Sequence, residues 1–175
     1  MRVAVIGAGS FGTVLADIAA HNQCDVKIYA RRTELVEEIN LHRRNSRYHP
    51  ELELHDSIHA VSDLREVVHE ADIVLLSVPS KSMDHVCSEL ARVIAEQTAL
   101  LSTTKGIDSD GFKLMSQVIS ERLPDHPVGG LSGPNLAQEV AERHLTASVV
   151  ASESPIVRKL TRNAFATKYL RLYSS

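Results

Sequence analysis

The sequence predicts a doubly wound α/β domain, with a mostly parallel sheet and helices on both of its faces. Three observations predict it. A short apolar run at the start leads into closely spaced glycines, strand-like and helix-like stretches alternate along the chain, and residues 71–78 are almost continuously apolar. A strand that is apolar at nearly every position is typical of a parallel sheet covered on both faces. Ligands of such folds bind at the carboxyl ends of strands, so those ends hold the candidate sites.

The strands are predicted from short runs that are apolar or alternate between apolar and polar residues. They are expected at residues 3–6, 25–29, 71–78, 99–103, 128–131, 146–151 and 168–173. The first run is wholly apolar, the second alternates, and Pro79 closes the third. The remaining runs each alternate with a helical stretch, as units of strand, helix and parallel strand require.

The helices are predicted from apolar residues that recur at helical spacing. They are expected at residues 13–20, 33–41, 62–69, 82–95, 112–122, 135–143 and 155–166. Thr33 suits the N-cap of the second helix, and Pro155 stands near the first turn of the last. Residues 43–50 break the helical pattern and predict a loop, in which Pro50 restrains His49 to an extended conformation.

Size and composition fit a single domain over residues 1–175, with a net charge of −3. The basic residues are mostly scattered, which disfavours nucleic acid and anionic membranes as partners. No apolar run approaches the roughly 18 residues that a membrane span needs. Cys24 and Cys87 lie far apart and no cleavable signal precedes the first strand, so we expect free thiols and a cytoplasmic location.

Three glycines after the first strand form the pattern that binds dinucleotides. Gly7 permits the tight turn out of the strand, Gly9 lets the backbone approach a pyrophosphate, and Gly12 allows close packing of helix and strand. The free N–H groups that begin the following helix would meet the anion. A glycine turn without a ligand is the alternative. The strand before and the helix after the glycines favour the nucleotide site of a Rossmann-type domain.

Two arginines stand where such domains distinguish NADP from NAD. An acidic residue near the end of the second strand normally bonds the ribose 2′-hydroxyl of NAD, and this chain has Arg31 and Arg32 there. Two guanidinium groups suit a 2′-phosphate, so NADP(H) is favoured and NAD(H) is the alternative. The competing interpretation is that both arginines are solvated loop charges.

Three further strand ends carry candidate residues. Pro79 lies where the nicotinamide-side ribose would cross the sheet. A proline that simply ends a strand is an equally good explanation of this residue. Lys105 stands beside small hydroxyl residues and a glycine, where a polyanionic or carbonyl-bearing substrate could dock, and an exposed structural lysine is its alternative. The N–H groups from Asn135 to Ala137 suit a bound ligand, while a plain helix cap explains Asn135 as well.

Nine histidines raise the question of a metal site. Four of them cluster in the sequence: His42, His49, His55 and His59. None forms a zinc-ligand pattern with another histidine or with a cysteine, so we expect solvated loop histidines and no metal.

Five motifs, in this order and spacing, carry a resemblance. They are Gly7-Ala-Gly-Ser-Phe-Gly-Thr-Val-Leu-Ala16, Asn45-x-x-Tyr48-x-Pro50, Ser77-Val-Pro-Ser80, Thr104-Lys-Gly-Ile107 and Ser132-Gly-Pro-Asn-x-Ala-x-Glu-Val140. Together they resemble the N-terminal domain of the soluble, bacterial-type NAD(P)-dependent glycerol-3-phosphate dehydrogenases. The resemblance implies the cofactor-binding half of an enzyme that reduces dihydroxyacetone phosphate to sn-glycerol 3-phosphate with NAD(P)H, for glycerophospholipid synthesis.

The resemblance also implies roles for single residues. The cofactor would be held by Gly7, Gly9, Ser10, Phe11, Gly12, Arg31, Arg32, Tyr48, Pro79, Lys105 and Ala137. The substrate would be held by Lys105, Gly133 and Asn135. Lys105 is the catalytic candidate, because no other obvious proton donor for the carbonyl oxygen lies in this chain.

In this family a helical substrate domain with the general acid/base follows, and we expect it to be absent here and the isolated chain to be inactive. An expressed fragment or truncated product, a stand-alone NADP-binding module such as a cofactor sensor, and one half of a split enzyme are the open interpretations. The Rossmann half of a related dehydrogenase, such as a ketopantoate reductase-like enzyme, is a further alternative. An uncovered docking surface would favour self-association, with a homodimer as one form.

Overall fold

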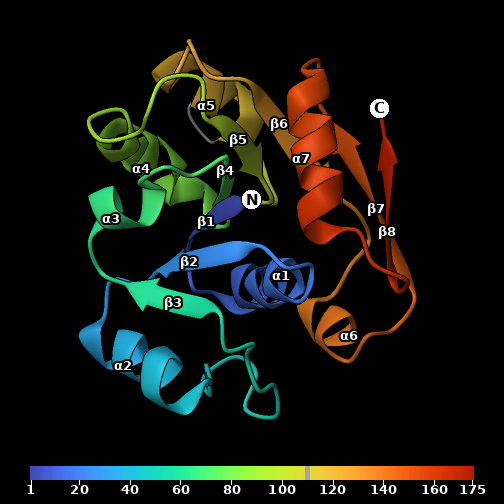
Figure 1. Cartoon of the computed structure of the whole chain (residues 1–175). Helices are drawn as coiled ribbons and strands as arrows, with labels where there is room; N and C mark the ends of the chain where they lie inside the picture. The colour runs from blue at the N-terminus through green and yellow to red at the C-terminus, as the bar shows by residue number, and fades with distance from the viewer. Residues whose placement is uncertain (109–110) are drawn as a thin grey trace.

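The sheet of this protein is continuous and mostly parallel. The computed structural model describes residues 1–108 and 111–175, and within them eight strands pair in the order β3-β2-β1-β4-β5-β6-β7-β8. The strands are β1 (Arg2–Ile6), β2 (Asp25–Tyr29), β3 (Ile58–Val61), β4 (Ile73–Leu76), β5 (Ala99–Ser102), β6 (Val128–Ser132), β7 (Thr146–Ala151) and β8 (Leu170–Ser174). Only the β6–β7 pair is antiparallel, and β3 and β8 form the two edges (Figure 1). The predicted doubly wound α/β fold is confirmed.

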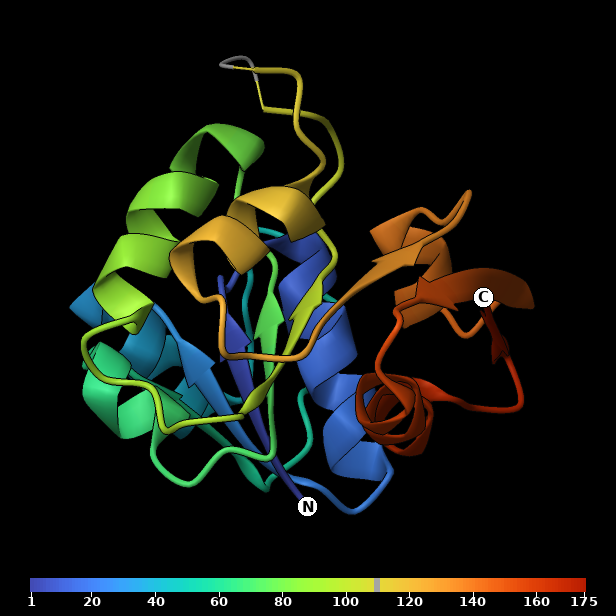
Figure 2. The same cartoon turned by 90° about the horizontal axis from the view of Figure 1, so that it is seen from above.

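Helices cover both faces of this sheet (Figure 2). They are α1 (Ser10–His21), α2 (Thr33–His42), α3 (Leu64–Val68), α4 (Met83–Leu90), α5 (Met115–Arg122), α6 (Ala137–Ala141) and α7 (Pro155–Phe165), with a 3₁₀ turn η1 (Ser80–Ser82). None of the helices in the described part of the chain is long and apolar enough to span a membrane.

The alternation of side chains in β1 produces two hydrophobic cores. Val3 and Val5 point to one face, where they pack with the apolar sides of α1, α2, α6 and α7. Ala4 and Ile6 point to the other face, which α3, α4 and α5 cover. Because both faces of β1 are buried, the strand is apolar at nearly every position, as a central parallel strand requires.

The sequence prediction missed one strand and misplaced several helix ends. Strand β3 was not predicted, although Ile58 and Ala60 are buried and the residue between them is exposed. Helix α1 begins at Ser10 rather than at residue 13, because the glycines belong to the turn and to the first helical turn. Thr33 is the first residue of α2 and not its N-cap, since Arg32 has extended backbone angles there.

Candidate functional site

The glycine turn, residues 7–12, lies where the order of strands reverses. It follows β1, whose last residue Ile6 is paired with Tyr29 at the end of β2 and with Leu76 at the end of β4. The chain leads from β1 outward to β2 and β3 on one side, and then to β4 on the other. Ligands of open α/β sheets bind at such reversal points, outside the carboxyl ends of the strands.

The three glycines of the turn meet different surroundings. Gly7 has a φ of +115°, and a Cβ atom there would lie 2.4 Å from the Ser77 carbonyl oxygen. At Gly12 a Cβ atom would lie 2.1 Å from the Gly7 carbonyl oxygen, so only glycine fits between the turn and α1. At Gly9 a Cβ atom would meet nothing within 4 Å. Two glycines are therefore required by the fold, and the third leaves open space beside the backbone.

The N-terminus of α1 faces this turn without a capping side chain. Gly9 is the N-cap, the first turn contains no acidic residue, and the first backbone bond runs from Thr13 N to Gly9 O at 3.0 Å. The N–H groups of the three preceding residues have no acceptor among the described residues. Unbonded N–H groups and the positive end of a 12-residue helix suit an anion. The residues present thus fit the diphosphate of a dinucleotide.

Arg31 and Arg32 follow β2 directly and are exposed. Neither guanidinium group makes a hydrogen bond or an ion pair within the described part of the chain, although the Arg32 carbonyl oxygen accepts from the N–H groups of Leu35 and Val36. The pKa of the Glu38 carboxyl is lowered mainly by its hydrogen bond from Ser46. The positive charge of Arg32 lowers this pKa further. The arginines are near the glycine turn, because the strands that precede both segments are paired along their whole length.

The loop over residues 43–50 folds back onto the glycine turn. Asn45, only 1% exposed, donates through Nδ2 to the Ala8 carbonyl oxygen at 3.0 Å and to Thr13 Oγ1 at 2.9 Å. His49 is 7% exposed and its Nε2 atom lies 3.0 Å from Ser10 Oγ. The prediction of a solvated histidine was wrong at this position, because the loop packs against α1 instead of extending into solvent.

Tyr48, between these two residues, remains exposed. Its ring stacks under the Arg47 guanidinium at 5.6 Å from the ring centroid. Across a cavity of about 430 Å³ the loop faces α6, with Gln138 and Glu142 on the far wall. Ala137, the first residue of α6, is half-buried.

The ends of β4 and β5 are joined by a threonine. Thr104 Oγ1 donates to the Val78 carbonyl oxygen at 2.7 Å. The next residue, Lys105, is exposed, and its Nζ donates to the Asn135 carbonyl oxygen at 3.1 Å. Pro79 is exposed as the N-cap of η1. The fold therefore brings into contact two predicted site residues, Lys105 and Asn135, that lie 30 positions apart in the sequence.

Asn135 is buried against β7 and is not a helix cap. Its Nδ2 atom donates to Ser148 Oγ at 3.0 Å, and its Oδ1 atom has no partner among the described residues. Helix α6 begins at Ala137 with Leu136 as its N-cap, so the predicted helix start at residue 135 was wrong. A Cβ atom at Gly133 would lie 2.4 Å from Asn135 Oδ1, so the small residue makes room for the amide.

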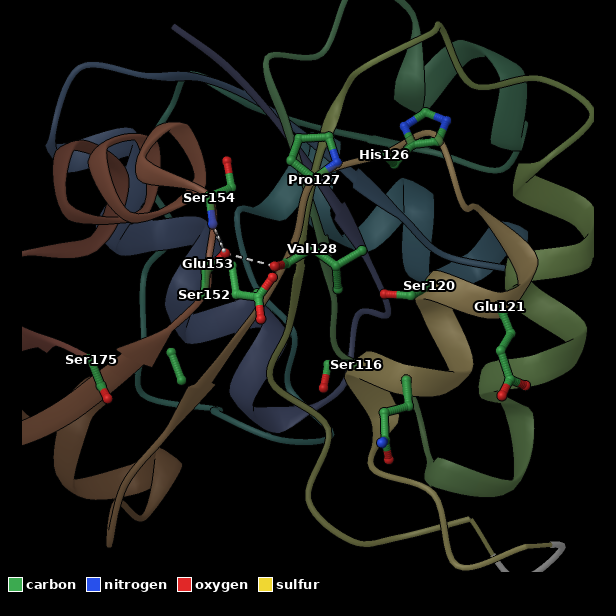
Figure 3. Close-up of a pocket in the computed structure, with 13 residues that line it drawn as sticks. Ser116, Ser120, Glu121, His126, Pro127, Val128, Ser152, Glu153, Ser154 and Ser175 are labelled. Carbon is green, nitrogen blue, oxygen red and sulfur yellow. Dashed lines mark hydrogen bonds between the residues drawn. The ribbon is translucent and has the colours of Figure 1, made fainter.

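Another cavity lies at the other end of the sheet's strands, beside the amino end of β6 (Figure 3). Its volume is about 970 Å³, and its wall includes Val128 at the start of β6 and Ala151 at the end of the antiparallel β7. Ser152 Oγ donates to the Val128 carbonyl oxygen at 2.6 Å across one side of it. None of the predicted site residues lines this cavity, so the candidate site, at the carboxyl ends of β1, β2, β4 and β5, is a separate region.

The two cysteines are free thiols, as predicted, and both are buried. Burial raises the pKa of the Cys87 thiol to about 12 and also raises that of Cys24. Neither thiol is a nucleophile at neutral pH, because the reactive form is the thiolate.

The chain matches a known family over most of its length. The N-terminus of NAD-dependent glycerol-3-phosphate dehydrogenase is matched by residues 2–157. A curated glycerol-3-phosphate dehydrogenase named for NAD(P)+, from Acinetobacter baumannii (strain SDF), is 43% identical over 175 residues, which are 100% of this chain and 49% of that protein. Its counterpart from Teredinibacter turnerae is 41% identical, with 100% and 52% covered. The chain spans about half the length of the curated relatives it matches.

Solved structures show the same fold. Glycerol-3-phosphate dehydrogenase from Coxiella burnetii superposes with a TM-score of 0.93 at 28% identity, over 99% of this chain and 53% of that chain. A UDP-D-ManNAc dehydrogenase from Pyrococcus horikoshii superposes with a TM-score of 0.74 at 14% identity, over 100% of this chain and 47% of that chain. The second likeness concerns the fold alone.

Proposed function

Since this chain belongs to the family of NAD-dependent glycerol-3-phosphate dehydrogenases, through the N-terminal part of that family, we propose that it is the cofactor-binding half of such an oxidoreductase. The reaction would reduce dihydroxyacetone phosphate to sn-glycerol 3-phosphate, a precursor of glycerophospholipids. The observation that carries the proposal is the open space at Gly9 beside the uncapped start of α1. The residues there suit a diphosphate and leave room for it.

Within this proposal the residues of the glycine turn hold the pyrophosphate. Ser10 and Phe11 begin α1 and offer N–H groups, while Gly7 and Gly12 fix the shape of the turn. When bound, the nicotinamide cofactor supplies the hydride. Arg31 and Arg32 favour NADP(H), because two exposed guanidinium groups that form no ion pair within the described ranges suit a 2′-phosphate.

The substrate would dock where the ends of β5 and β6 meet. Lys105 uses one of its three ammonium hydrogens on the Asn135 carbonyl oxygen, which leaves two for a phosphate or carbonyl oxygen. The unpartnered Oδ1 atom of Asn135 is a buried acceptor that a substrate hydroxyl would satisfy. Lys105 is the candidate proton donor in this half. We propose that the second, helical half of the enzyme supplies the remaining substrate contacts and the general acid/base.

A non-catalytic NADP-binding module is the second candidate, because the open space at Gly9 and the uncapped start of α1 would suit a dinucleotide whether or not a substrate binds. An experiment distinguishes the two candidates: the purified chain is mixed with the C-terminal half of the Acinetobacter baumannii protein. Turnover of dihydroxyacetone phosphate supports the enzyme half, whereas tight NADPH binding without turnover supports the module.

Location and assembly are parts of the same proposal. Buried free thiols are in keeping with a reducing cytoplasm. Val149 and Tyr173 are paired across β7 and β8 and are 42% and 57% exposed. Such exposed apolar residues would favour contact with a second copy or with the other half of the enzyme.

Calorimetric titration with NADPH and with NADH tests the proposed function. We expect both to bind, with NADPH tighter, and a further heat when dihydroxyacetone phosphate is added to the NADPH complex. If neither nucleotide binds the folded chain, the proposal fails.

A further inference from the structure

His49 is buried in a loop whose neighbouring residues are exposed. Its exposed fraction is 7%, against 40% for Tyr48. Removing a polar ring from water is unfavourable unless its nitrogen atoms find partners. Nε2 finds two, because it lies 2.9 Å from the Ser10 carbonyl oxygen and 3.0 Å from Ser10 Oγ.

The chemistry of these two contacts determines which atom carries the hydrogen. A carbonyl oxygen only accepts, so His49 Nε2 donates to the Ser10 carbonyl oxygen. The same N–H group faces Ser10 Oγ, which accepts as the second branch of a three-centre bond. The hydroxyl hydrogen of Ser10 is therefore directed away from His49. It remains a donor at the first residue of α1, beside the unbonded N–H groups.

Residues 45–49, which we call the brace, are held from both sides. Toward the glycine turn, Asn45 donates to Ala8 O and Thr13 Oγ1. Toward α2, Ser46 N donates to Glu38 Oε1 at 2.8 Å. Within the brace, His49 N donates to Asn45 O at 2.9 Å. The imidazole is thus fixed by a network and does not simply fill a gap.

We propose that His49 is a positioning residue for the dinucleotide and acts through Ser10. It holds the first residue of α1 so that the Ser10 hydroxyl donates to an oxygen of the pyrophosphate. The inference rests on the proposed function, because it presumes that a dinucleotide binds at the glycine turn. In this role His49 makes no direct contact with the nicotinamide ring or with the substrate.

The test measures the dissociation constant of NADPH by calorimetry for a set of variants. We expect His49→Leu to weaken binding about five- to tenfold, the usual effect of a lost neutral hydrogen bond. His49→Gln should restore affinity to within about twofold, because its amide nitrogen carries an N–H near the place of Nε2. His49→Asn keeps a polar amide that is too short to reach Ser10, and it should bind as weakly as His49→Leu.

A double-mutant cycle with Ser10→Ala asks whether the effect passes through Ser10. In the Ser10→Ala background we expect His49→Leu to change the affinity less than about twofold further. His69→Leu is the control, since His69 is exposed and stands before the amino end of β4, whereas the glycine turn follows the carboxyl end of the parallel β1. It should bind NADPH like the wild type.

The outcomes separate the inference from the proposed function. Equal losses in His49→Gln and His49→Leu, or an undiminished loss in the Ser10→Ala background, would mean that His49 only packs the loop. Wild-type affinity in a folded His49→Leu would also overturn the inference. If His49→Leu does not fold, the difference between the Gln and Asn variants decides. If the folded wild-type chain does not bind NADPH, both the proposed function and this inference are refuted.

Discussion

Replacing Gly9 or Gly12 with alanine should separate what the fold needs from what the ligand needs. At Gly12 the new Cβ atom would lie 2.1 Å from the Gly7 carbonyl oxygen, which is backbone, and 3.2 Å from Ser77 Cβ. Carbon-to-oxygen contacts are ordinarily about 3.3 Å or longer, so α1 and the turn must separate by about 1 Å. Such overpacking destabilises by about 1–3 kcal/mol or more, while the gain in helix propensity is at most about 1 kcal/mol.

At Gly9 the same change should leave the fold intact. The backbone has a φ of −83°, which any residue adopts, and the Cβ atom would meet nothing within 4 Å. The loss of a preferred N-cap residue limits the change in unfolding free energy to about 1 kcal/mol. The methyl group would, however, stand where the pyrophosphate approaches the backbone. We expect NADPH affinity to fall at least about tenfold, or about 1.4 kcal/mol.

The assay combines urea unfolding with calorimetric NADPH titration of both variants. Gly12→Ala should lower the urea midpoint clearly and lose binding with it. Gly9→Ala should keep the midpoint and lose binding alone. Full affinity in a stable Gly9→Ala would refute the assignment of this open space to the dinucleotide, and an unchanged midpoint for Gly12→Ala would refute the steric argument.

Three further predictions concern charge and proton binding. Arg31→Glu should abolish any preference for NADPH over NADH in calorimetry, and unchanged selectivity would show that the arginine is a solvated bystander. Lys105→Met should remove the heat of dihydroxyacetone phosphate binding to the NADPH complex, which would persist if the lysine has no substrate role. Between pH 9 and 12 the urea midpoint should fall, because the unfolded chain releases the Cys87 proton near the ordinary pKa of 9.0 and the folded chain keeps it to about 12. Cys87→Ala should reduce that fall, and an identical pH profile would contradict the assigned cause.

The central strands of the sheet could be predicted because both of their faces are buried, and their residues are therefore apolar. Val74 and Leu75 point to opposite faces and both are fully buried, so the apolar run in β4 needed no knowledge of the rest of the chain. Strand β3 was harder, because its four residues include exposed His59 and follow a histidine-rich loop. Only pairing with β2 makes that segment a strand.

The residues of the site were less predictable, since their positions depend on distant contacts. Nothing near His49 in the sequence indicates that the loop returns to Ser10, 39 positions earlier. The motif with Asn45 and Pro50 was the one available signal, and it did not reveal which side chains face the turn. Asn135 resembles a helix cap from its neighbours, but Ser148, 13 positions later, determines the direction of its amide.

The central claim is that a dinucleotide binds at the glycine turn and not in the cavity of about 970 Å³ beside the amino end of β6. Backbone amide chemical shifts of the ¹⁵N-labelled chain during NADPH titration test it most directly. The account predicts saturable shifts at residues 9–12 and at Arg31 and Arg32, with residues such as Ser116 and Ser152 unmoved. Shifts confined to Ser116, Ser152 and the other residues of that cavity, with residues 9–12 unchanged, would contradict it.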